Sequence, residues 1–150
     1  MPFTKIKYSK GEVILQWRDE AAHSTITHEL SSSDTPRPEL VTALAAFGSY
    51  VLDICEFEAT YARELTVQSV SISPSEKMGR GLVVTALKSL KGAYSPLVLN
   101  TPFLSEEASS EGGLQLPAEA VRFLDRLEEE AAKYRAGERA QQDFFLKKVV

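Results

Sequence analysis

Histidine and cysteine side chains are the first to consider for chemistry, and the 150-residue chain has only three of them. His23 and His28 are the two histidines, so any histidine-based acid–base or metal chemistry must use them. Five residues apart, they would point to opposite faces of a regular strand. A shared metal would need a bulge between them or ligands from elsewhere. We therefore expect ordinary surface histidines.

A second group of reactive residue types lies in the segment DICEFE. Asp53 and Glu56 are three residues apart and can share a helix face, which allows a carboxylate pair for a metal. The alternative, which we favour, is that they form the solvated side of a helix whose other side packs on the core. Cys55 has no histidine close in sequence and is predicted to be a packing residue. A single cysteine also excludes an intramolecular disulfide, as suits a reducing compartment.

The segment SEKMGRG has the composition of an anion-binding loop. Its basic residues lie among glycines, whose backbone N–H groups are accessible and whose φ can be positive. Lysines on an adjoining strand can extend the patch, and a polar Asn-Thr pair can join it if the fold brings it close. The alternative is a charged hairpin tip that keeps the protein in solution. The candidate residues for an anionic ligand or nucleotide are Lys77, Arg80, Lys88, Lys91, Asn100 and Thr101.

The charge distribution bears on nucleic-acid binding. The whole chain has a net charge of −4, whereas residues 61–104 carry five Lys or Arg against two Asp or Glu. The aromatic residues that could stack on bases, Tyr8, Trp17 and Tyr94, are not interleaved with this basic run. A nucleic-acid-binding role is therefore an alternative rather than the first expectation.

Several catalytic motifs are missing from the sequence. No Gly-Lys-Ser/Thr follows a glycine run, and GRGLVV lacks the third glycine of a dinucleotide-binding fingerprint. There is no Gly-x-Ser-x-Gly elbow and no His-Glu-x-x-His helix. We expect a protein that is not an enzyme and uses no cofactor or metal.

Hydrophobic periodicity predicts strands, a helix, more strands and a second helix. TKIKYSKGEVILQW is typical of a β-hairpin that turns at Ser9 to Glu12, and HSTITHEL can add a third strand. One helix is predicted from about Pro36 to about Phe57. LTVQSVSIS, LVVTALKSL and SPLVLN are predicted strands, and the second helix begins at Pro117 and ends near Gly137. The fold class is therefore α+β, with mostly antiparallel β-meanders and two main helices packed on the sheet.

The continuous apolar run of SPLVLN suggests a central strand covered on both faces. Asn100, the only asparagine, precedes Thr101-Pro102, and we interpret its amide as part of an Asx-type turn rather than a ligand contact.

Residues 1–137 are expected to form a single domain, followed by an apolar tail over 138–150. Such a tail is expected to dock either on its own domain or on another copy of the chain. The second alternative would make the protein an oligomer. Its candidate interface residues are Phe144, Phe145, Leu146, Val149 and Val150. No stretch approaches the length of a membrane span and the N-terminus lacks a signal-peptide core, so a cytoplasmic protein without membrane contact is expected.

In style and order, TPRPELVTALAAFGSYVLDICEF, GLVVTALKSL and SPLVLNTPFL resemble small uncharacterised proteins encoded by bacteriophages and prophages. The resemblance implies a bacterial setting, or the host cytoplasm for a phage-encoded protein, and transfers no site residues. The function expected first is a non-catalytic, self-associating binding protein that acts on a protein partner. The alternatives are an accessory nucleic-acid-binding protein of phage replication or recombination and a binder of an anionic small ligand or nucleotide.

Overall fold

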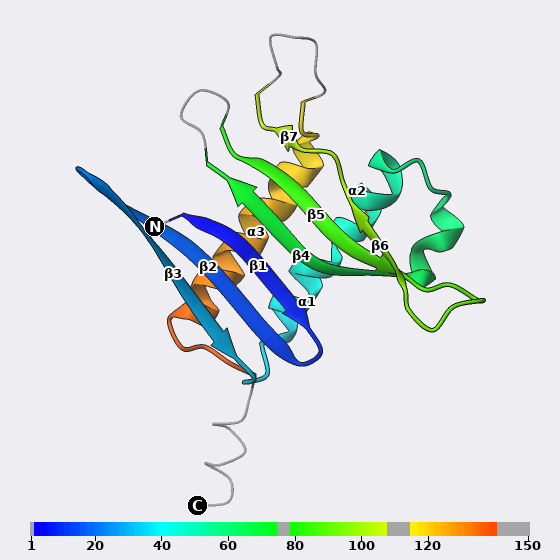
Figure 1. Cartoon of the computed structure of the whole chain (residues 1–150), viewed down its shortest axis with the longest axis horizontal. Helices are drawn as coiled ribbons and strands as arrows, with labels where there is room; N and C mark the ends of the chain where they lie inside the picture. Colours follow the sequence, from blue (N-terminus) through cyan, green and yellow to red (C-terminus); the bar gives the residue numbers. More distant parts are fainter. Residues whose placement is uncertain (1, 75–78, 108–114, 141–150) are drawn as a thin grey trace, which may run out of the picture.

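The structure, a computed structural model, describes residues 2–74, 79–107 and 115–140. Within them the chain alternates strands and helices in the order predicted from the sequence (Figure 1). The elements are β1 (Phe3–Ser9), β2 (Glu12–Ala21), β3 (Ser24–Ser32), α1 (Pro38–Ala45), α2 (Phe47–Ile54), the 3₁₀ helix η1 (Ala59–Glu64), β4 (Leu65–Ser73), β5 (Gly81–Lys88), β6 (Leu97–Asn100), β7 (Leu104–Ser105) and α3 (Ala118–Arg135).

The strands form one antiparallel sheet in the order β3-β2-β1-β4-β5-β6, and β7 pairs with β5. The predicted α+β class is confirmed. The first hairpin turns at Lys10 and Gly11, which have φ values of 53° and 76°. Positive φ at both positions matches the two-residue turn whose twist suits a hairpin.

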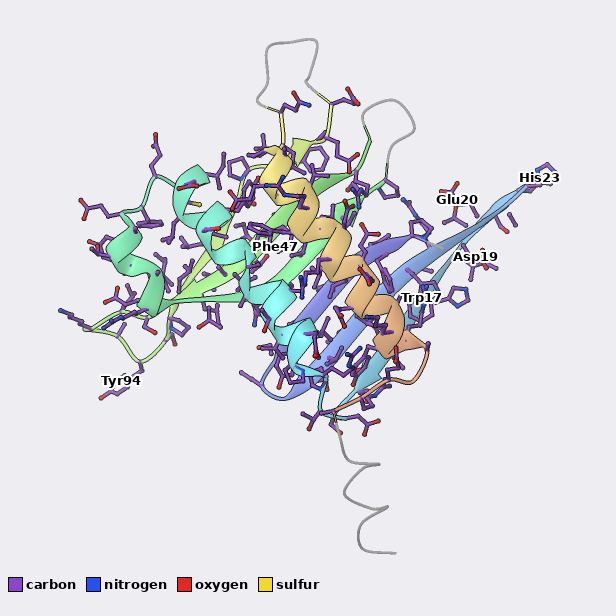
Figure 2. All side chains as sticks on the ribbon, turned by 180° about the vertical axis from the view of Figure 1, so that it is seen from behind. Trp17, Asp19, Glu20, His23, Phe47 and Tyr94 are labelled. Atoms are coloured by element: carbon purple, nitrogen blue, oxygen red, sulfur yellow. The ribbon has the colours of Figure 1, made fainter. Side chains whose placement is uncertain are left out.

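One face of the sheet is apolar and covered, and the other is polar and open. Side chains directly opposite one another form an apolar row across five strands: Leu30, Leu15, Ile6, Val70 and Val84. The neighbouring row points to the other face and is largely polar: Ser31, Ile14, Lys7, Ser69, Thr85 and Asn100. The helices α1, α2 and α3 all lie behind the sheet in Figure 1 and in front of it in Figure 2.

The imperfect alternation of β4 comes from a β-bulge. The register against β5 shifts between Val67 and Ser69. One extra residue in a strand reverses which side chains face the core, so that Val67 and Val70 are both buried although they are three residues apart.

The single helix predicted from Pro36 to Phe57 is wrong, because the segment forms two helices of eight residues that meet at Ala46. Ala46 keeps a helical backbone, but the Ser49 hydroxyl donates a hydrogen bond to its carbonyl at 3.3 Å. Gly-Ser pairs and such back-bonding hydroxyls are common causes of helix bends, and Gly48 directly precedes Ser49.

The expectation of a central SPLVLN strand covered on both faces is also wrong. β6 is the last strand in the sheet order, and the exposed fractions of Leu97 and Val98 are 42% and 56%. The interpretation of the Asn100 amide as part of an Asx-type turn is wrong too. The amide oxygen accepts a hydrogen bond from the Thr85 hydroxyl at 2.7 Å, across the β5–β6 strand pair. An apolar run indicates that a segment forms a strand. The position of that strand in the sheet depends instead on pairing with residues far away in the sequence.

The second predicted helix is confirmed as α3, and Gly137 follows it with φ of 107°. The Tyr134 hydroxyl donates to the Asp34 carbonyl at 2.7 Å, and Arg37 pairs with the buried Glu130 at 3.6 Å. These contacts attach the end of α3 to the segment that enters α1. No helix among the described residues is long and apolar enough to cross a bilayer.

Glu56, which follows the C-cap of α2, has a left-handed backbone conformation. Glu56 has φ of 59°, and the N–H groups of Glu56 and Phe57 donate to the carbonyls of Asp53 and Leu52. This is the hydrogen-bond pattern of a Schellman cap, which usually has glycine at the left-handed position.

We therefore expect Glu56→Gly to raise the free energy of unfolding by about 0.5–1 kcal/mol, because relief of the left-handed strain exceeds the entropic cost of glycine. Thermal or urea unfolding measures it. Glu58→Gly is the control, since Glu58 is also exposed but has φ of −68°. Equal destabilisation by both substitutions would contradict the expectation.

Candidate docking groove

An open apolar groove of about 660 Å³ lies beside α1 and α2. One wall is the side of α1 and α2, the other is η1, and the floor is the start of β4 with the end of β1. The lining residues are Tyr8, Val41, Leu44, Ala45, Gly48, Ser49, Leu52, Ala59, Ala62, Leu65, Thr66 and Val67.

The α1–α2 wall follows from helical periodicity. Val41, Gly48 and Leu52, with residues 44, 45 and 49 between them, recur at three and four positions and so lie along one side of the two helices. Near the middle of this wall the side chains are small. A Cβ atom added at Gly48 would have no heavy atom within 4 Å, so this stretch of wall is open.

The η1 wall is attached to the sheet through Lys88. Its ammonium group lies 3.2 Å from the Glu64 carboxylate and 4.8 Å from the centre of the Tyr61 ring. The Ser89 N–H also donates to the Glu64 carbonyl at 2.9 Å. Since the Lys88 side chain is only 13% exposed, we interpret it as a residue that positions η1.

The groove offers apolar surface and few groups for chemistry. None of its lining residues is charged, and Tyr8, Ser49 and Thr66 supply its hydroxyl groups. The Ser49 hydroxyl already donates to the Ala46 carbonyl, and no acid or base lines the cavity beside it. This arrangement suits binding of an apolar surface rather than nucleophilic or acid–base catalysis.

Arg80, predicted to bind an anion, is surrounded by carboxylates of the protein itself. Its Nε, Nη2 and Nη1 atoms lie 2.5, 2.7 and 2.9 Å from the carboxylate oxygens of Glu106, Asp125 and Glu128. Burial works to lower the pKa of the guanidinium, but the hydrogen bonds to these three carboxylates outweigh it and raise the pKa above its ordinary value. Arg80 therefore joins β5, the segment after β7 and α3.

The other predicted anion-site residues that the structure describes do not gather around Arg80. Lys88 lies at the far end of β5, about 25 Å away at 3.3 Å per residue. The Thr101 hydroxyl accepts a hydrogen bond from the Val84 N–H at 2.8 Å, and its side chain is buried, so Thr101 terminates β6. Lys91 lies in the exposed hairpin between β5 and β6, and Lys77 lies outside the described residues.

The two histidines occupy different surroundings. His23 lies at the tip of the long β2–β3 hairpin (Figure 2). His28 stacks on Trp17 with ring centres 5.5 Å apart, and its Nε2 lies 3.8 Å from Asp19. Among the described residues no three His, Cys, Asp or Glu side chains group as a metal site, and burial raises the pKa of the Cys55 thiol, which disfavours its reactive thiolate at neutral pH.

Sequence reasoning missed the groove because residues of five elements, β1, α1, α2, η1 and β4, build it. The helical stripe of α1–α2 was visible as core, but η1 was not predicted. The only local signal was the run of Ala, Gly and Ser in the first helix, a composition that allows close approach of another element.

The structural role of the Arg80 ion pairs can be tested by measuring the free energy of unfolding. Arg80→Ala should lower the free energy of unfolding by about 2–3 kcal/mol, because three carboxylates would remain close together without their cation. Chemical unfolding measures the loss, with Arg126→Ala on the exposed side of α3 as control. If the two variants are equally stable, Arg80 is not structural and becomes a ligand candidate again.

Comparisons of the chain with protein families, with curated proteins and with solved structures found no match. A function for this chain is therefore inferred from its own residues and contacts.

Proposed function

We propose that the protein is a non-catalytic binding protein whose groove docks an amphipathic helix of a protein partner. The observation that carries this proposal is the 660 Å³ groove with an uncharged, mainly apolar lining. An apolar cavity of this size exposed to solvent is typical of an interaction site, because water against apolar surface is unfavourable.

The shape of the lining favours a helix as occupant. Ala45 and Gly48 lie on one wall and Ala62 on the other, so a helix backbone can approach both walls closely. Larger residues at the ends and floor, including Val41, Leu52 and Leu65, provide apolar contacts for side chains spaced three and four apart on the docked helix. Each fully buried aliphatic side chain contributes about 1.5–3 kcal/mol to such binding.

The two alternatives have weaker support. An anionic ligand would have to compete with three carboxylates for Arg80. For nucleic acid, Lys5 and Lys7 lie on the open face of the sheet, but Tyr8 and Trp17 pack against the core on the covered face, where they offer no stacking platform beside these lysines.

Two further parts of the proposal come from the sequence alone. The resemblance to phage and prophage proteins supports action inside a bacterial cell. The apolar tail residues Phe144, Phe145, Leu146, Val149 and Val150 lie outside the described residues, so self-association through the tail stays a prediction.

Substitution of Gly48 tests the groove. Gly48→Leu should weaken binding of an amphipathic Leu/Ala/Lys peptide of about 18 residues, long enough to be helical, by at least about tenfold, since the new side chain fills space that the peptide needs. Fluorescence anisotropy of the labelled peptide measures the dissociation constant.

Gly92→Leu is the matched control, because Gly92 also has no heavy atom within 4 Å of an added Cβ but lies in the β5–β6 hairpin. We expect unchanged binding in this variant. No binding to the unsubstituted protein, or equal binding by both variants, would overturn the docking proposal.

A further inference from the structure

We infer that β6 is a self-association edge, at which two copies of the chain pair antiparallel and join their sheets. The inference is independent of the groove and of the C-terminal tail. It rests on the position of β6, the exposure of its side chains and the free hydrogen-bonding groups of its backbone.

Apolar side chains at the β6 end of the sheet are left exposed by the described residues. Val98 is 56% exposed, Leu97 42% and Leu90 41%, and Tyr94 at the hairpin tip is fully exposed. Figure 2 shows Tyr94 at the opposite end of the molecule from His23. Apolar residues exposed singly are common, but a group on one sheet edge is typical of an interface.

The backbone of β6 has groups available for a further strand. The Thr101 N–H donates to the Val84 carbonyl at 3.0 Å, which makes this opposite pair a hydrogen-bonded one. Hydrogen-bonded pairs alternate along an antiparallel ladder, so the N–H and C=O groups of Leu97 and Leu99 point to β5. Those of Val98 and Asn100 therefore point outward, where no described strand pairs with them.

The opposite edge of the sheet has a different character. β3 carries His28, Glu29 and several Ser and Thr, and polar or charged residues discourage pairing with another chain. β6 has neither a charge nor a bulge within it, and its protection is limited to its short length between Pro96 and Pro102. The two edge strands thus differ in their polar and charged side chains, which control whether an edge pairs with another chain.

A second copy of the chain is the occupant that fits this edge. Residues 96–102 contain no charged side chain, so pairing of two β6 strands brings no like charges of these segments together, and a charged partner would find no opposite charge on them. Antiparallel pairing about a two-fold axis also gives each copy the same exposed groups, as an isologous interface requires.

The free backbone groups define one register. With the axis at Leu99, Val98 of each copy lies opposite Asn100 of the second copy, and all four outward N–H and C=O groups of each strand form hydrogen bonds. Leu99 already packs against the core on the helix side, so the two Leu99 side chains extend that core across the junction. A four-residue contact is small, so we expect a dissociation constant of roughly 10–100 µM.

Sedimentation equilibrium from about 1 µM to 1 mM tests the association. We expect the mass to rise with concentration from 16.6 kDa toward the dimer value. Val98→Lys should weaken the dimer at least tenfold, because a charge would be placed in the pairing strand. Ile26→Lys, at a 50% exposed position on β3, should leave it unchanged.

Several results would overturn the inference. They are a monomer at every concentration, equal effects of the two lysine substitutions, or a dimer that survives Val98→Lys but is lost when the chain ends at Ala140. Thermal melting of Val98→Lys establishes that the variant is folded, which an exposed substitution should allow.

Disulfide trapping tests the register in a Cys55→Ala background. Leu99→Cys should link two copies on mild oxidation, because residues directly opposite at the axis have Cα atoms close enough for a disulfide. Val98→Cys should link poorly, since the two substituted residues are offset along the strands by two positions. Efficient linking of Val98→Cys without linking of Leu99→Cys would contradict this register.

Discussion

The arrangement of the helices follows from one constraint: the apolar face of the antiparallel sheet must be covered. The buried row from Leu15 through Ile6 and Val70 to Val84 runs across the centre of that face. Removing this surface from water is the dominant stabilising contribution, and the helices are the elements that do it. The polar face opposite needs no cover, so α1, α2 and α3 lie together on the apolar side (Figure 1).

The groove is the place where this cover is incomplete. α3 packs beside α1. It is fixed near its middle by the ion pairs of Asp125 and Glu128 with Arg80, and at its C-terminal end by the Tyr134 hydroxyl on the Asp34 carbonyl. No described helix fills the space between α2 and η1, and the Ala-Gly-Ser side chains of that wall leave it open. An amphipathic helix from a partner would complete the layer, which gives the proposed binding the same physical basis as the fold.

Local patterns predicted the elements well and their assembly poorly. The turn at Lys10-Gly11 and the second helix were predictable because the glycines and the apolar period are local signals. The interruption at Ala46 was missed because a Gly-Ser pair is only a weak helix breaker. The role of Arg80 was missed because its carboxylate partners lie 26, 45 and 48 residues away in sequence.

The central claim is that an amphipathic helix docks between α1–α2 and η1. Amide chemical shifts of ¹⁵N-labelled protein, recorded while an unlabelled amphipathic peptide is added, test it most directly. The account predicts that the largest shifts fall on Ala45, Gly48, Ala62 and Thr66, on both walls and the floor of the groove. Shifts confined to the open sheet face or to β6, or none at millimolar peptide, would contradict it.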